Sequence, residues 1–168
     1  MRIATMVLAA ALLAAGRASA CDYEHARYAL AGDPSVVAEF TKPKDHVPEM
    51  AGDLFFYIKM KRRKLTYWYF PDRGTEDVTM ISMLDPREKD WQPPDPDSRW
   101  FRPHPDEPFY AFGDDYRDRF ELPSRRQRAA KLLFLPNLAH EAWYGGLDGD
   151  NRFDLARGLF VRRCITAK

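Results

Sequence analysis

The chain has 168 residues, of which 45% are hydrophobic and 14% aromatic, and this composition suits one folded domain rather than a disordered chain despite 13 prolines. Its 26 Lys and Arg side chains nearly balance 25 Asp and Glu side chains, so we expect no nucleic-acid partner, which would require a basic surplus on one face. No segment approaches the roughly 20 consecutive apolar residues of a transmembrane helix, so no membrane-spanning segment is expected.

Residues 1–20 have the three parts of a secretory signal peptide. Arg2 supplies the basic start, residues 6–15 form the apolar middle, and residues 18–20 are Ala-Ser-Ala, a site of the kind that signal peptidase cleaves. We therefore predict a signal peptide over 1–20 and a single β-rich domain over 21–168. The expected location is secreted or periplasmic.

The two cysteines of the chain, Cys21 and Cys164, lie next to the two ends of the expected mature domain. In an exported protein an even pair of cysteines is interpreted first as a disulfide, which here would join the two ends of the fold. Two alternatives stay open: two unrelated thiols, or a lipid anchor on Cys21 that would consume the thiol. Ala18 weakens the lipid-anchor hypothesis, because lipoprotein signals normally carry Leu at this position.

Alternation of apolar and polar residues with a period of two, which is typical of β-strands, dominates the first half of the chain. In the segment 53–61, Leu54, Phe56 and Ile58 fall on one face, which we assign to the core. Residues 71–74, Pro-Asp-Arg-Gly, have the composition of a turn. The strand-like segments predict a hairpin followed by a three-stranded meander, and they are 25–31, 35–41, 53–61, 65–70 and 77–83.

The segment 85–108 is rich in proline and contains two tryptophans. Proline at this density cannot maintain the hydrogen bonds of a sheet, so a long proline-rich loop is predicted. Exposure of large aromatic side chains is unfavourable, and we therefore expect Trp91, Trp100 and Phe101 to hold the loop against the core.

The last third of the chain again predicts short elements. Ser124 suits the cap of one helical turn over 125–130. Residues 131–135 and 152–163 are strand-like, whereas 138–144 fits a helix and a strand equally well. With about eight strands and little helix, the sequence predicts an all-β, mostly antiparallel fold that is either a small sandwich or a partly open barrel.

Asp148, Asp150 and Asp154 are the candidate metal ligands, because closely spaced carboxylates occur in calcium-binding loops. The match to such a loop is poor, since Arg152 stands where an oxygen ligand belongs and Phe153 where glycine belongs. A tight turn before the last strand is the simpler interpretation. No cofactor is expected.

A basic run and two tryptophans are the candidates for binding. The basic run would suit an anionic lipid, a cell-wall polymer or an acidic protein, although a soluble turn that discourages edge pairing is the simpler interpretation. The run consists of Lys59, Lys61, Arg62, Arg63 and Lys64. Trp68 and Trp100 would suit a sugar- or peptide-binding surface, and burial under the proline-rich loop is the alternative.

His140 and Glu141 are the candidates for catalysis, because a histidine beside a carboxylate can act as a general base or a metal ligand. In an extended segment, however, neighbouring side chains point to opposite faces. The sequence contains no GxSxG motif and no glycine-rich phosphate loop. We therefore expect an exported, non-enzymatic domain that binds a protein or a cell-envelope component. The alternative is a small hydrolase or metal-dependent enzyme whose site, with His140, Glu141 and Asp150, is assembled only in the fold.

Overall fold

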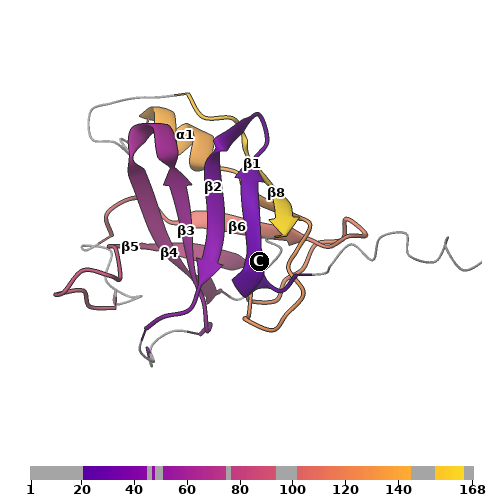
Figure 1. Cartoon of the computed structure of the whole chain (residues 1–168), viewed down its shortest axis with the longest axis horizontal. Coiled ribbons are helices and arrows are strands. Elements are labelled where there is room, and N and C mark those ends of the chain that lie inside the picture. Colours follow the sequence, from indigo (N-terminus) through magenta and orange to yellow (C-terminus); the bar gives the residue numbers. More distant parts are fainter. Residues whose placement is uncertain are drawn as a thin grey trace, which may run out of the picture.

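The protein is a closed barrel of eight antiparallel strands (Figure 1), in which each strand pairs with its neighbours in sequence and β8 pairs with β1. The computed structural model describes residues 21–44, 47, 51–74, 77–93, 102–144 and 154–164. This architecture confirms the expected antiparallel all-β fold with little helix. The predicted signal peptide lies outside the described residues.

Short turns join β1 to β2, β3 to β4 and β4 to β5, and longer segments join the other consecutive strands. The strands are β1 (Ala26–Leu30), β2 (Asp33–Thr41), β3 (Phe55–Met60), β4 (Leu65–Arg73), β5 (Val78–Met83), β6 (Glu107–Phe112), β7 (Leu132–Leu135) and β8 (Gly158–Cys164). Among the described residues, the helical elements are α1 (Leu138–Tyr144) and two single 3-10 turns, η2 (Tyr23–His25) and η3 (Lys61–Arg63). The predicted hairpin and meander correspond to β1–β2 and β3–β5. The helical turn expected after Ser124 is one hydrogen-bonded turn, from the Gln127 N–H to the Ser124 carbonyl oxygen at 3.1 Å.

The inside of the barrel is filled by side chains. Leu54, Phe56 and Ile58 are fully buried, as the alternation in this segment predicts. The Phe40 ring packs on Phe56 at a centroid distance of 4.9 Å and on Tyr23 at the same distance. An eight-stranded barrel has an interior just wide enough to be filled in this way, so the interior is a packed hydrophobic core.

A second apolar cluster covers the outer face of β3, β4 and β5. It explains why these strands carry large apolar residues on both faces: Phe55, Trp68, Phe70, Ile81 and Met83 are buried there together with Val47. Trp91 packs against the cluster, with its ring centroid 5.6 Å from that of Phe55. The predicted packing of the proline-rich segment against the fold is therefore confirmed at Trp91, whereas Trp100 and Phe101 lie outside the described residues.

Two proline-containing segments were predicted as turn and loop but belong to strands. β4 continues through Pro71 to Arg73, and β6 begins at Glu107 inside the expected loop. The pairing of β4 with β3 ends at Tyr69, so Pro71 has a strand partner on one side only, where proline is tolerated. Pro108 likewise pairs with β5 alone.

The C-terminal region closes the barrel. Segment 138–144 is the helix α1, and β8 is shorter than the predicted strand over 152–163 because it begins at Gly158. Cys21 and Cys164 form a disulfide with their Cα atoms 5.8 Å apart, beside the pairing of β1 with β8. The predicted link between the two ends of the fold is thus confirmed, and it occupies the Cys21 thiol that a lipid anchor would need. No helix in the described part of the chain has the length and apolar composition required to cross a membrane.

Candidate functional site

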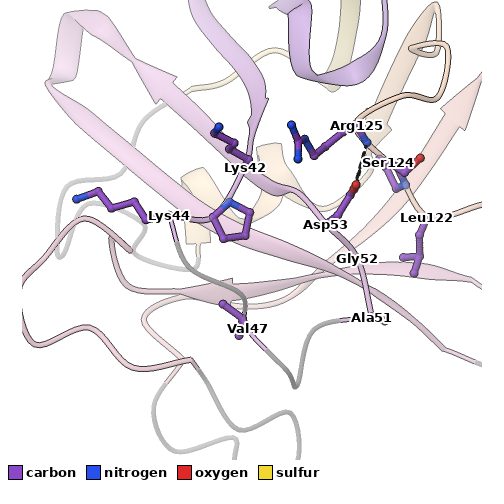
Figure 2. A pocket seen from close by; sticks show the side chains of 11 residues that line it. Lys42, Lys44, Val47, Ala51, Gly52, Asp53, Leu122, Ser124 and Arg125 are labelled. Atoms are coloured by element: carbon purple, nitrogen blue, oxygen red, sulfur yellow. Dashed lines mark hydrogen bonds between the residues drawn. The ribbon is translucent and has the colours of Figure 1, made fainter.

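The short segment Lys42–Lys44, which follows β2, separates two surface pockets. Lys42 and Lys44 are exposed and line both pockets. The first pocket has a volume of about 590 Å³ and is shown in Figure 2. The second, of about 310 Å³, lies over the outer faces of β3 and β4. This arrangement places two lysines where they can contact a ligand in either pocket.

The first pocket has a mixed lining that is held together by Asp53 and Arg125. The Arg125 backbone N–H donates to Asp53 Oδ1 at 3.1 Å, the bond drawn in Figure 2, and Arg125 Nε donates to Glu24 Oε2 at 3.1 Å. In this view Lys42 and Arg125 extend toward the same side, whereas Lys44 points away from them. The Arg125 guanidinium is therefore paired already, and the two lysines supply the charge available to a ligand.

The second pocket has aromatic rings set among four cations. β3 and β4 are in register at Tyr57 and Trp68, which places the two rings side by side with their centroids 4.8 Å apart. The Tyr57 hydroxyl donates to Glu39, which fixes the ring. We call this pocket the cationic groove and define it by Lys42, Lys44, Lys59, Arg87, Tyr57 and Trp68.

Arg87 lies across the aromatic floor of the cationic groove. Its guanidinium carbon is 4.9 Å from the centroid of the Trp68 ring, a cation–π contact. Asp85 holds the guanidinium in place, because Arg87 Nε donates to Asp85 Oδ1 at 2.8 Å. These hydrogen bonds lower the pKa of the Asp85 carboxyl. A smaller pocket of about 280 Å³ continues from here along Lys44, Lys89 and Trp91.

The cationic groove carries an excess of positive charge. In the described ranges, Lys42, Lys44 and Lys59 form no ion pair with another residue, and Arg87 is neutralised by Asp85. Lysines without a fixed partner at a pocket edge retain their full attraction for an anion. The cationic groove therefore combines positive charge, aromatic rings and a concave shape.

Of the predicted binding residues, Trp68 and Lys59 line the cationic groove, and the rest of the basic run does not. Trp68 is buried, with 5% of its surface exposed, because Arg87 from the proline-rich segment lies over it. The burial interpretation of Trp68 is thus confirmed, and a role of Trp68 in binding stays a prediction. Arg62 and Arg63 instead line a separate pocket of about 480 Å³ that also contains the carboxylates of Asp33 and Asp154.

The remaining predicted sites stay predictions, because several of their residues are not among those that the structure describes. Asp148, Asp150 and Trp100 lie outside the described residues, and Asp154 is exposed. No cluster of three or more potential metal-ligating side chains occurs in the part of the chain that is described. On α1, the His140 ring packs on Tyr144 at a centroid distance of 4.9 Å, whereas Glu141 lies near Glu107 at the barrel end.

Sequence analysis missed the lysines at 42 and 44, Arg87, and a buried polar cluster inside the barrel. The cluster consists of Tyr69, His104 and Glu107, whose terminal polar atoms Oη, Nε2 and Oε2 have no hydrogen-bond partner among the described residues. Burial lowers the pKa of His104 to about 4 and, together with Glu141, raises the pKa of Glu107 to about 8. Glu107 could have been identified from the alternation over 107–112. This alternation places Glu107, Phe109 and Ala111 on one face of the strand.

Fold and site together define a small disulfide-linked up-and-down β-barrel with a cationic groove on its outer face. Comparison of the chain with protein-family models, with curated proteins and with solved structures finds no match.

Proposed function

We propose that this protein is an exported, non-enzymatic binding protein that holds an anionic polymer of the cell envelope in the cationic groove. The observation that supports this most directly is the convergence of Lys42, Lys44, Lys59 and Arg87 around the adjacent rings of Tyr57 and Trp68. The signal-like residues 1–20 and the Cys21–Cys164 disulfide support an oxidising location outside the cytoplasm.

The chemistry of the cationic groove suits acidic sugars. Lysine ammonium groups donate charge-assisted hydrogen bonds to carboxylate or phosphate oxygens, and aromatic rings offer an apolar surface to the faces of sugar rings. Because Trp68 is covered by Arg87, the exposed part of the floor is Tyr57 with the Arg87 side chain beside it. A ligand would therefore lie on these two side chains, with its acidic groups toward Lys42, Lys44 and Lys59.

The continuity of the pockets favours a polymer over a single small anion. Lys42 and Lys44 line both the cationic groove and the pocket of about 590 Å³, and Lys44 also lines the pocket beside Trp91. A bound polymer that extends from one pocket to the other across the segment Lys42–Lys44 would keep its acidic groups near lysines along its length. Several weak ionic contacts then add up, and the resulting affinity falls as salt rises.

The proposal is tested by titrating the purified protein, with its disulfide intact, with polygalacturonate as an acidic probe. The readout is tryptophan fluorescence at low salt, and neutral dextran serves as the control polymer. Lys42→Ala combined with Lys59→Ala should weaken binding about tenfold, since each exposed ionic contact contributes up to about 1 kcal/mol. Lys61→Ala combined with Arg62→Ala removes the same charge from two exposed positions of the adjacent turn that do not line the groove, and it should weaken binding less than twofold.

Three outcomes would overturn the proposal. One is the absence of salt-sensitive binding to polygalacturonate, and a second is an equal loss of affinity in the two double variants, which would indicate attraction by overall charge. The third is tighter binding of a single-stranded oligonucleotide of equal charge, which would indicate a nucleic-acid partner instead.

A further inference from the structure

The buried polar cluster of Tyr69, His104 and Glu107 lies where β4, β5 and β6 run side by side. Tyr69 pairs with Ser82 of β5, and Met80, two residues earlier in β5, pairs with Glu107 of β6. Paired residues, and residues two apart in one strand, share a face of a sheet. Tyr69 and Glu107 therefore both point into the barrel, where Tyr69 is fully buried and Glu107 has 1% of its surface exposed.

His104 is held beside Tyr69 by the segment that precedes β6. Its ring packs edge-on against the Tyr69 ring at a centroid distance of 4.7 Å and against the Tyr67 ring at 5.2 Å. The Ser82 hydroxyl donates to the His104 carbonyl oxygen, and the Ser82 backbone N–H donates to Asp106 Oδ1 at 2.9 Å. Ser82 thus anchors this segment to β5 and fixes the position of the imidazole.

The proton of the neutral His104 ring can be placed from its contact with the backbone. Nδ1 is 3.3 Å from the carbonyl oxygen of Pro105. A carbonyl oxygen can only accept a hydrogen bond, so Nδ1 carries the proton and Nε2 presents a lone pair. Nε2 of His104 is therefore an acceptor that needs a donor.

The terminal polar atoms of the cluster are buried without a protein partner in the described structure. These atoms are Tyr69 Oη, His104 Nε2 and Glu107 Oε2. A buried polar atom without a hydrogen bond is strongly unfavourable, and such atoms nearly always have a partner in the protein or in ordered water. Three of them on neighbouring inward-facing side chains indicate a partner that they share.

We infer that the barrel contains an internal water-binding site formed by Tyr69 Oη, His104 Nε2 and Glu107 Oε2. The hydrogen-bonding capacities match, because water can accept the Tyr69 hydroxyl proton and donate its own two protons to Nε2 and to the carboxyl oxygen. About three hydrogen bonds are typical of a buried water molecule. Bulk water is close to the site, since His104 and Tyr67 also line a surface pocket of about 490 Å³.

A high-resolution crystal structure of the unmodified protein tests the inference directly. A water oxygen should lie within about 2.6 to 3.2 Å of Tyr69 Oη, His104 Nε2 and Glu107 Oε2. Direct hydrogen bonds among the three side chains would overturn the inference. So would well-ordered side chains without water density between them, or density for a larger molecule at this position.

Tyr69→Phe provides a second arm in solution, because a hydrated hydroxyl and an unpartnered hydroxyl predict opposite effects. Removal of a hydroxyl that is bonded to water should lower the urea midpoint, whereas removal of a buried hydroxyl without a partner should raise it. Tyr28→Phe is the matched control, since the buried Tyr28 hydroxyl donates to the Ala130 carbonyl oxygen at 3.0 Å, and it should also lower the midpoint. A Tyr69→Phe midpoint equal to or above that of the unmodified protein would contradict the water site.

Discussion

The guanidinium of Arg87 lies over the ring of Trp68, 4.9 Å from its centroid, and so joins the proline-rich segment to the outer face of β4. The contact gives Arg87 two roles, since it both covers the indole and forms part of the lining of the cationic groove.

Replacement of Arg87 by alanine should weaken the binding of polygalacturonate about threefold to tenfold and shift the tryptophan emission to longer wavelength, because Trp68 becomes hydrated. Fluorescence titration measures both effects. Arg117→Ala is the matched control, because Arg117 likewise pairs with an aspartate two residues earlier, at 3.8 Å, and is well exposed. Equal effects of the two substitutions would contradict the assignment of Arg87 to the groove.

Loss of the disulfide should strongly destabilise the barrel. The bond closes a loop with a sequence separation of 143 residues, for which the chain-entropy model predicts about 4 to 5 kcal/mol as an upper value. Cys21→Ser combined with Cys164→Ser should lower the free energy of unfolding by a similar amount in urea denaturation. Reductant should destabilise the unmodified protein and leave the double variant unchanged. Two titratable thiols in unreduced, natively exported protein would show that the bond does not form.

Phe56→Ala should lower the free energy of unfolding by about 3 to 5 kcal/mol, because it opens a cavity among the fully buried rings of the interior. Lys59→Ala, on the opposite face of the same strand, should change it by less than about 0.5 kcal/mol. Urea denaturation of both variants provides the measurement. Similar midpoints would mean that the register of β3 is wrong.

His104 should make the protein sensitive to acid. Its pKa is lowered to about 4 in the folded protein, chiefly by burial, but is near 6.5 in the unfolded chain. Between these two pH values the unfolded chain binds a proton that the folded protein does not bind. The contribution of neutral His104 to the free energy of unfolding is therefore complete above about pH 6.5 and is lost as the pH falls to about 4. The loss amounts to up to about 3 kcal/mol.

Replacement of His104 by glutamine should flatten the acid side of the stability curve, as measured by urea denaturation at a series of pH values. Exposed His140→Gln is the control and should leave that side of the curve as it is. An unchanged acid dependence in the His104 variant would assign the effect to other groups.

Gly158 should tolerate no side chain. A Cβ atom at this position would collide with the carbonyl oxygen of Leu135 in the neighbouring strand β7. Gly158→Ala should therefore destabilise the protein by about 1 to 3 kcal/mol in thermal or urea denaturation. At Gly52 the nearest atoms would be 3.7 Å from an added Cβ, an ordinary contact, so Gly52→Ala should cost little by comparison.

The strands that can be predicted from the sequence are those whose alternation is uninterrupted. Leu54, Phe56 and Ile58 identify the core face of β3 because a strand places every second side chain on the same side. β6 was missed because Glu107 and Pro108 resemble a loop, and their acceptance in a strand depends on partners far along the chain. The local pattern of apolar and polar residues contains no information about these partners.

The cationic groove could be predicted only in part for the same reason. Trp68 was identified as a binding candidate because an aromatic residue on an outer face is conspicuous in a sequence. Lys42 and Arg87 are ordinary charged residues that meet at Trp68 only when β2, β4 and the proline-rich segment pack together. The closed ring of strands, which brings these segments to one place, is a tertiary property.

The order in which the barrel can be completed follows from its last strand. β8 is paired with β1 on one side and β7 on the other, so the last strand of the barrel in chain order fills the gap between the first strand and the seventh. Until β8 is in place, β1 and β7 each have an open sheet edge, and such edges invite pairing with other chains. The barrel therefore protects its first strand only when its last strand has folded, so folding and protection from aggregation depend on the same step.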